Sequence, residues 1–474
     1  MPRTKIVCTI GPATNSPDMM RALIRAGMNV ARINFSHGER AAHAQSISTL
    51  RQIAEQEDCL VAVMADLQGP KLRVGEIEGG AVELRKGEIV TLTSRPRPDA
   101  ANEIPVPHPE LLHDLRVGQA VLLDDGNLEL TVAQAGESHL ECRVVTGGRL
   151  TSHKGINVPG AALRLSTLTP KDRADAAFAL EQGVDFFALS FVRRAADVRE
   201  LRQFLQDKGA DVPIIAKIEK PEALFALDEI LAEADGMMVA RGDLGVETPA
   251  EEVPFHQKRI IRACNRAGKP VITATQMLQT MIENPRPTRA EASDVANAIL
   301  DGSDAVMLSG ETAVGSYPVA AVETMARICT NAEAHLTSSP MHDESGSHET
   351  ITEAISCAAV EIADEISGTA IITATMSGMT ARMVARHRPS VPIVAVTPSQ
   401  ATLARLALVW GVEPVLVEPF ETTDDMVEMM VRTVRQKGVA AWGDPVVLTA
   451  GIPFGSGGRT NMLKVHVVGE SEEA

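Results

Sequence analysis

Eight short apolar segments alternate with helix-like stretches, and this alternation constrains the fold more than any other feature of the 474 residues. The segments are residues 4–11, 29–35, 61–67, 185–191, 213–219, 236–243, 270–275 and 305–310. Helical patterns such as 17–28, 173–183 and 255–268 lie between them, and several end in glycine, as helix C-termini prefer. Eight such units predict a closed TIM (β/α)8 barrel. An open doubly wound α/β sheet shows the same alternation and stays the alternative.

Residues 70–165 interrupt this pattern with short strand-like runs separated by turn signals at 78–80, 124–127 and 135–138. They predict a small β-barrel lid domain inserted after the third barrel strand. An insertion at that end of a barrel is well placed to cover an active site.

The C-terminal part begins after a polar segment at 338–350, which we interpret as a linker. Further apolar runs follow at 369–375, 392–398, 413–418, 445–451 and 463–469. They predict a separate α/β regulatory domain with a mostly parallel sheet. The expected division is barrel domain A over 1–69 and 166–340, lid domain B over 70–165, and domain C over 341–474.

The charge and cysteine content narrow the class of protein. With 45 Lys plus Arg against 62 Asp plus Glu, the net charge of −17 disfavours nucleic acid or an anionic membrane as a partner. A local basic pocket for an anionic metabolite is still possible. The six cysteines form no CxxC pair, which suggests free thiols in a reducing compartment. Without a signal-like start or a membrane-spanning run, we expect a cytoplasmic protein.

Polar residues follow one face of the second strand. Arg32, Asn34 and Ser36 are spaced by two, so their side chains share the face opposite an apolar one. Three polar side chains directed into a barrel are costly unless water, a ligand or an ion meets them. A satisfied polar layer is the structural alternative.

Most of the other strands also end in charged or hydroxyl residues, where TIM barrels place catalytic groups. These residues are Asp66, Lys217, Glu219, Asp243, Thr275 and the segment 309–312. The mixture of charges indicates an anionic, metal-bound ligand, although Lys217 alone could belong to a buried ion pair. Glu219 and Asp243 offer hard oxygen ligands that suit Mg²⁺ or Mn²⁺ completed by substrate and water.

Several of these segments resemble pyruvate kinase. The strings TKIVCTIGPAT, AGMNVARINFSHG, AKIEKPE, ARGDLGVE and PTRAEASDVANAILDGSDAVMLSGETAVGSYP carry the resemblance across the barrel, and SHKGINVPG carries it into the lid. The family implies a barrel, a lid and a regulatory C domain, usually in a homotetramer. It also implies transfer of the phosphoryl group of phosphoenolpyruvate to ADP, giving pyruvate and ATP.

The resemblance implies a role for each matching residue. Lys217 would stabilise the transferring phosphoryl group and the enolate, and Arg32 would contact the phosphoryl group. Glu219 and Asp243 would bind the divalent metal. The phosphoenolpyruvate site would comprise Arg32, Gly242, Asp243 and Thr275, and Thr275 with a bound water is a candidate proton donor.

The nucleotide and monovalent-cation sites are implied in the same way. The positions near the nucleotide phosphates are Asn34, His37, Arg73 and Lys154. The monovalent-cation site would comprise Asn34, Ser36, Asp66 and the backbone carbonyl of Leu67.

One residue departs from the potassium-dependent members, which carry a glutamate where this chain has Lys71. The pattern resembles the potassium-independent branch of the family. A tethered ammonium near Asp66 could supply the charge of K⁺ and repel a second cation, so we expect no K⁺ requirement. The alternative is that Lys71 points to solvent at the lid hinge.

In domain C, a strand-to-helix turn carries Thr375, Ser377, Gly378 and Thr380. Hydroxyls and helix N-terminal N–H groups can hold a phosphate. The turn resembles the family's effector loop for a sugar phosphate or a nucleotide monophosphate, although a plain turn would use similar residues. The Gly-rich segment 451–461 could close over such a ligand or be a surface loop.

Two other functions compete with this interpretation. A metal-dependent aldolase acting on phosphoenolpyruvate or pyruvate enolate would share the metal pair and an arginine, but it would not need the lid or Lys154. A non-catalytic metabolite sensor would be supported by loss of Lys217, Glu219 or Asp243. All three are present.

Overall fold

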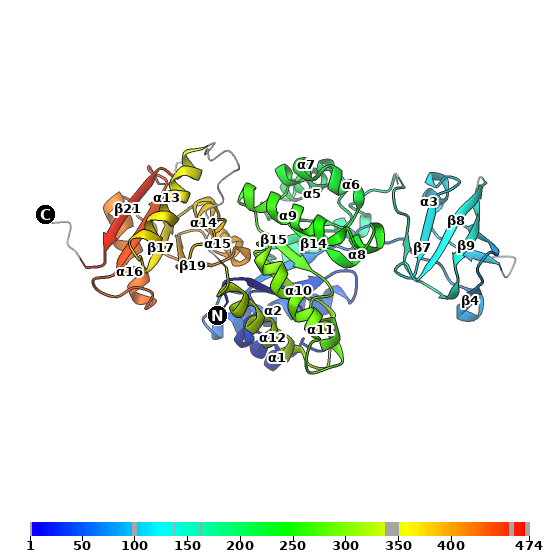
Figure 1. Ribbon diagram of the computed structural model, residues 1–474, viewed down its shortest axis with the longest axis horizontal. Helices are drawn as coiled ribbons and strands as arrows, with labels where there is room; N and C mark the ends of the chain where they lie inside the picture. Colours follow the sequence, from blue (N-terminus) through cyan, green and yellow to red (C-terminus); the bar gives the residue numbers. More distant parts are fainter. Residues whose placement is uncertain are drawn as a thin grey trace.

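The computed structural model describes residues 2–96, 102–136, 138–161, 164–336, 350–454 and 459–469. These form a central barrel with a β-rich lid at one end and an α/β domain at the other (Figure 1). The predicted linker falls almost wholly outside the described residues, and the domain boundaries stay a prediction. Within the described part of the chain, no helix is long and apolar enough to cross a membrane.

The eight predicted segments form a closed parallel barrel, in which β1 pairs with both β2 and β16. This result confirms the TIM barrel and excludes the open sheet. The strands are β1 (Lys5–Thr9), β2 (Val30–Asn34), β3 (Ala62–Asp66), β12 (Phe186–Leu189), β13 (Ile214–Ile218), β14 (Gly236–Ala240), β15 (Val271–Ala274) and β16 (Ala305–Leu308).

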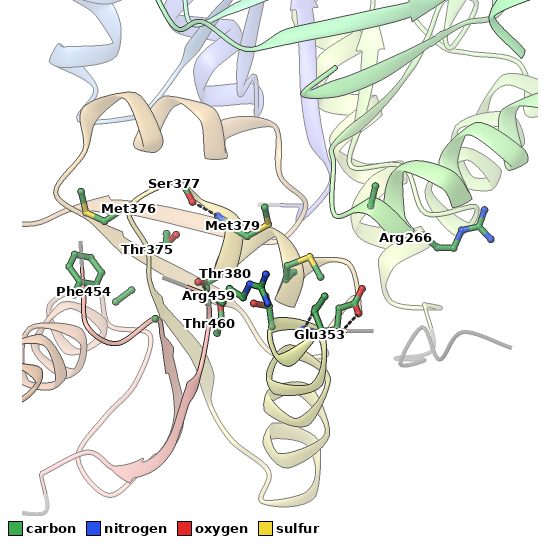
Figure 2. A pocket seen from close by; sticks show the side chains of 16 residues that line it. Arg266, Glu353, Thr375, Met376, Ser377, Met379, Thr380, Phe454, Arg459 and Thr460 are labelled. Atoms are coloured by element: carbon green, nitrogen blue, oxygen red, sulfur yellow. Dashed lines mark hydrogen bonds between the residues drawn. The ribbon is translucent and has the colours of Figure 1, made fainter. Parts of the chain in front are cut away.

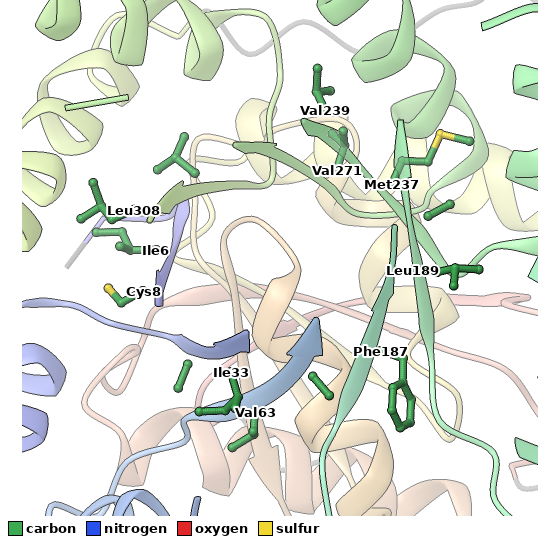
Figure 3. Packing of buried hydrophobic residues seen from close by; sticks show 14 of the residues in the cluster. Ile6, Cys8, Ile33, Val63, Phe187, Leu189, Met237, Val239, Val271 and Leu308 are labelled. Atoms are coloured by element: carbon green, nitrogen blue, oxygen red, sulfur yellow. The ribbon is translucent and has the colours of Figure 1, made fainter. Parts of the chain in front are cut away.

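Helices cover the outside of the barrel because alternate strand residues point outwards. Ile33, Val63 and Leu189 point away from the barrel axis (Figure 3) and belong to the buried cluster shared with the helices. The helices are α1 (Pro17–Ala26), α2 (Arg40–Gln56), α4 (Pro170–Glu181), α5 (Ala195–Asp207), α6 (Pro221–Phe225), α7 (Leu227–Glu233), α8 (Arg241–Glu247), α9 (Val253–Ala267), α10 (Arg289–Leu300), α11 (Gly310–Ala313) and α12 (Pro318–Glu333).

The lid contains a six-stranded sheet in the order β11-β7-β8-β9-β5-β6 and a separate ladder of β10 with β4. The inserted β-rich lid is therefore confirmed, although its described strands form an open six-stranded sheet with β11 and β6 at its edges and not one closed ring. The elements are β4 (Ala81–Leu84), β5 (Ile89–Thr93), β6 (Glu103–Pro105), α3 (Pro109–Asp114), β7 (Ala120–Leu123), β8 (Leu128–Ala135), β9 (His139–Thr146), β10 (Gly148–Thr151) and β11 (Ile156–Asn157).

The C-terminal sheet has the order β19-β18-β17-β20-β21, and only β20 and β21 are antiparallel. The mostly parallel sheet is therefore confirmed. Its elements are α13 (Ile351–Glu365), β17 (Ala370–Ala374), α14 (Met379–Ala385), β18 (Ile393–Thr397), α15 (Gln400–Arg405), β19 (Val412–Leu416), α16 (Thr423–Gln436), β20 (Pro445–Ala450) and β21 (Met462–Val467).

The C-terminal domain packs against the amino ends of the barrel strands. Ala407 and Leu408 join the buried cluster of the barrel interior. Asp304, just before β16, accepts a hydrogen bond from Arg388 Nη1 at 3.0 Å, and Lys5 Nζ donates to the carbonyl of Val412 at 2.8 Å. The lid follows the carboxyl end of β3, so the two added domains occupy opposite ends of the barrel (Figure 1).

Candidate active site

A buried cluster of charges lies at the carboxyl ends of the barrel strands. Lys217 Nζ is 2.7 Å from Glu219 Oε1 and 3.4 Å from Asp66 Oδ1. It also donates to Ser190 Oγ at 2.7 Å, and that hydroxyl donates to the carbonyl of Leu67 at 2.7 Å. The ammonium is therefore held from β3, β12 and β13 at once.

Arg32 completes the cluster from β2. Its Nε donates to Asp66 Oδ2 at 2.6 Å, and Nη1 donates to Thr9 Oγ1 at 2.9 Å. The residues on either side of Arg32, Ala31 and Ile33, point out of the barrel and are buried against the helices. On the predicted inward face of β2, Arg32 thus reaches the cluster, whereas Ser36 lies beyond the strand. Asn34 ends the strand, and its Oδ1 accepts from the backbone N–H of Ser36 at 3.1 Å.

The pKa values follow from burial and from these partners. Burial opposes ionisation of Asp66, but Lys217 and Arg32 hold the pKa of Asp66 below its usual range. Burial also disfavours the Lys217 ammonium, yet Asp66 and Glu219 raise the pKa of Lys217 above its ordinary value. Lys217 is therefore a permanent positive charge at the barrel mouth.

Glu219 and Asp243 are the candidate metal ligands. Burial raises the pKa of Glu219, and the nearby Asp243 charge adds to the rise despite Lys217. A carboxylate whose charged form is disfavoured gains from binding a cation. Two hard oxygen donors fit a divalent ion whose other ligands come from substrate and water. Within the described part of the chain, no cluster of three or more His, Cys, Asp or Glu side chains forms a site made by the protein alone.

A turn beyond β15 positions Thr275. Its φ of 66° lies in the left-handed region, and Arg241 Nη2 donates to its carbonyl at 2.7 Å. Thr275 Oγ1 accepts a hydrogen bond from the backbone N–H of Gly242 at 2.7 Å. A Cβ at Gly242 would lie 3.3 Å from that oxygen, so the close approach favours glycine. Thr275 and the turn before Asp243 are thus held side by side.

The residues predicted to contact the nucleotide fall into two places. His37 lies among basic side chains, and Lys154 pairs with an aspartate of the lid. Partial burial lowers the pKa of His37, and the positive charges of Lys71, Arg73 and Arg32 lower it further. Lys154 instead extends to the lid residue Asp124, with 2.6 Å between Nζ and Oδ1. The charges of Arg32, Lys71 and Arg73 therefore act on His37. Arg73 also donates from Nη1 to the carbonyl of His153 in the lid at 3.1 Å, and Lys154 is held within the lid.

Lys71 lies half-buried among the same charges. Burial, Arg73 and Lys217 lower the pKa of Lys71, while the charges of Asp243 and Asp66 oppose that shift. These charges therefore act on Lys71, whose side chain is only partly exposed. In the predicted monovalent-cation site, the carbonyl of Leu67 already accepts from Ser190.

Sequence reasoning missed two residues of the cluster. Ser190 is 3% exposed and links Lys217 to the carbonyl of Leu67. The backbone N–H of Phe191 donates to Glu219 Oε2 at 2.8 Å. The usable signal for Ser190 was its position, because a hydroxyl ends the fourth strand where other strands carry charges.

A cavity of about 510 Å³ lies over the predicted effector loop in the C-terminal domain (Figure 2). Thr375 Oγ1 accepts from the N–H of Gly378 at 2.9 Å, and Thr380 Oγ1 is 2.8 Å from Thr460 Oγ1. The lining also includes Ser377 and two arginines, Arg266 from the barrel and Arg459 from the C-terminal domain. The predicted loop residues Thr375, Ser377 and Thr380 therefore line a pocket, whereas Gly378 directly precedes α14 as its N-cap and is not among the lining residues.

Comparisons with known proteins agree over the whole chain. The family model "Pyruvate kinase, barrel domain" matches residues 1–322, and "Pyruvate kinase, alpha/beta domain" matches residues 353–466. A pyruvate kinase of Geobacillus stearothermophilus is 50% identical over 475 residues, covering 99% of this chain and 81% of the relative. One of Sporosarcina psychrophila is 45% identical over 476 residues, with the same coverage. The crystal structure of a pyruvate kinase from Cryptosporidium parvum matches with a TM-score of 0.93 and 37% identity, covering 98% of this chain and 96% of that one.

Proposed function

This chain belongs to the pyruvate kinase family and transfers a phosphoryl group from phosphoenolpyruvate to ADP, and we propose that the barrel cluster around Lys217 performs that transfer. The single observation that carries the proposal is the position of Lys217 between Asp66 and Glu219, beside Arg32. Phosphoryl transfer depends on positioning and charge neutralisation more than on covalent chemistry. A fixed cluster of this kind supplies both.

Lys217 and Arg32 would act on the shared negative charge of the reaction. The bond between phosphorus and the enol oxygen breaks, and a bond to the terminal phosphate oxygen of ADP forms. The electron pair stays on the enol oxygen as an enolate, which the permanently charged Lys217 stabilises. Because these donors are already oriented by hydrogen bonds, they need little reorganisation as charge develops.

Thr275 is the candidate for positioning the proton that converts the enolate to pyruvate. Its Oγ1 accepts from Gly242, so its own hydroxyl hydrogen is available to a bound water or to the substrate. A hydroxyl is weakly acidic, and we therefore assign Thr275 to holding the donor water over C3 of the enolate.

Glu219 and Asp243 would hold Mg²⁺ or Mn²⁺. When bound, that ion supplies positive charge to the phosphoryl oxygens and screens them from the two carboxylates. We further propose that the ammonium of Lys71 replaces K⁺, because it is partly buried and within range of the charges of Asp66 and Asp243. Activity without K⁺ is the expected consequence.

The finer assignments outside the barrel cluster are proposals of the same kind. His37, Arg73 and Asn34 would meet the nucleotide phosphates, and Lys154 would join them from the lid when it closes. The cavity over the effector loop would take a sugar phosphate or a nucleotide monophosphate. A homotetramer in the cytoplasm is the assembly and location that the family resemblance suggests.

The role of the barrel cluster is tested by comparing the activities of two Glu→Gln variants. Glu219→Gln removes a proposed metal ligand, whereas Glu229→Gln changes an exposed residue on α7 and serves as the control. The control should form pyruvate and ATP as fast as the wild type does. In Glu219→Gln, the rates of formation of both products should fall steeply. Full activity of Glu219→Gln would contradict the assignment.

A further inference from the structure

One buried carboxylate connects the lid to the barrel beside the proposed metal ligands. Glu247, the last residue of α8, is 4% exposed. Its Oε1 accepts from Asn157 Nδ2 in lid strand β11 at 2.7 Å and from Lys220 Nζ at 2.6 Å. Lys220 directly follows Glu219, and Asp243 lies in the first turn of α8. Glu247 therefore touches the lid and both segments that carry the metal ligands.

Lys220 extends this connection to the other side of the lid hinge. Its Nζ lies 5.2 Å from the centre of the Phe191 ring. The Phe191 N–H donates to Glu219 Oε2, and its φ of 58° shows a backbone held in the left-handed region. A Cβ at Gly69, where the chain leaves the barrel for the lid, would lie 2.8 Å from Phe191 Cδ2. The connection thus runs from one hinge segment to the other through Phe191, Lys220 and Glu247.

The chemistry of the connection indicates more than packing. Burying a lysine and a glutamate costs desolvation energy, and apolar residues of similar volume often hold two segments as well. Hydrogen bonds to one shared oxygen fix direction as well as distance. A lid that must return to one orientation needs such a directional contact.

We propose that Glu247 is a positioning residue that sets the lid against Glu219 and Asp243, with Asn157 as the attachment point and Lys220 as the counter-charge. The proposal rests on the assignment of those two carboxylates as metal ligands. A misplacement of about 1 Å can cost about 10²-fold in rate. Losing the attachment should therefore lower kcat while the phosphoenolpyruvate site in the barrel stays intact.

The experiment exchanges donor and acceptor in the full-length enzyme. N157D places a carboxylate against Glu247, and the double variant N157D/E247Q restores one bond between an amide and a carboxylate. We expect N157D to lower kcat by about tenfold or more, with KM for phosphoenolpyruvate within about twofold. The double variant should recover most of the lost kcat. N157A, which removes the contact without adding a charge, should lose less than N157D.

Thermal unfolding checks that each variant is folded, and N157A is the substitute if N157D is not. A folded N157A or N157D with wild-type kcat, or a double variant no faster than N157D, would overturn the proposal. Mn²⁺ binding by electron paramagnetic resonance, with E219Q as reference, separates the two hypotheses. Equal Mn²⁺ binding by E219Q and the wild type would overturn the metal assignment and this proposal with it. If E219Q binds Mn²⁺ more weakly than the wild type but the double variant does not recover kcat, the metal assignment stands and only the lid role of Glu247 is overturned.

Discussion

The barrel mouth and the pocket of the C-terminal domain both offer hydrogen-bond donors to an anion, but they do so in different forms. At the barrel mouth the donors are buried charges already paired with each other, such as Lys217 with Glu219 and Arg32 with Asp66. In the pocket they are mostly hydroxyls such as Thr375 and Thr380, and two arginines, Arg266 and Arg459, also line it.

The barrel mouth can therefore support chemistry, whereas the pocket is suited to binding alone. Charges fixed before the substrate arrives stabilise a transition state without reorganisation, although their burial costs stability. Neutral hydroxyls hold a phosphate reversibly and cost little when empty. Substitutions at the mouth should therefore change turnover, and substitutions in the pocket should change regulation alone.

The largest effect is expected at Lys217. Lys217→Ala removes the charge that stabilises the enolate and leaves Asp66 and Glu219 without their shared partner. We expect kcat to fall by roughly 10²-fold or more, which steady-state kinetics measures directly. Near-normal turnover would show that the paired charges at the mouth are structural, and the contrast between the two sites would disappear.

The next effect concerns the metal. Asp243→Asn should weaken Mn²⁺ binding by at least about 10–100-fold, because losing even an outer partner of a metal site has that effect. Titration followed by electron paramagnetic resonance gives the dissociation constant, and Asp228→Asn on the exposed side of α7 is the matched control. Unchanged affinity in Asp243→Asn would remove this residue from the site.

A smaller and more specific effect is expected at Lys71. Lys71→Glu replaces the tethered cation with an anion beside Asp66, so activity in K⁺-free buffer should drop by about tenfold or more, a change of about 1.4 kcal/mol. Added K⁺ should restore much of it. A variant that stays inactive with K⁺, or one that never needs it, would contradict the replacement of K⁺ by Lys71.

The smallest effect on basal rate is expected in the pocket. Thr380→Val removes a buried hydroxyl with little change of volume, so the rate without effector should stay within about twofold of the wild type. If AMP or glucose 6-phosphate activates or inhibits the wild type, that effect should be smaller in Thr380→Val. An effector typically changes the affinity for another ligand by about 5–150-fold, and the loss should lie within that range. A large loss of basal kcat in Thr380→Val would contradict the claim that substitutions in the pocket change regulation alone.

The sequence was most informative where local pattern decides structure. Barrel strands covered on both faces appear as apolar runs, and the polar residues at their ends identified Lys217, Glu219 and Asp243 as candidates for the site. The lid was predicted less well, because which strands pair across it depends on distant segments such as β4 and β10. Asn157 and Glu247 are 90 residues apart, and neither stands in a pattern that joins them. For Ser190, the position at a strand end was a signal, but nothing in the local pattern indicated its contact with Lys217.

The roles of the barrel-mouth charges are tested by the rate of pyruvate formation from phosphoenolpyruvate, ADP and Mg²⁺ in buffer free of K⁺ and NH₄⁺, before and after K⁺ is added. We expect comparable high rates in both conditions, because Lys217, Arg32 and Lys71 already supply the fixed positive charges. Activity only after K⁺ is added would contradict the role of Lys71. No pyruvate in either condition, even with sugar phosphate present, would contradict the assignment of phosphoryl transfer to the barrel mouth.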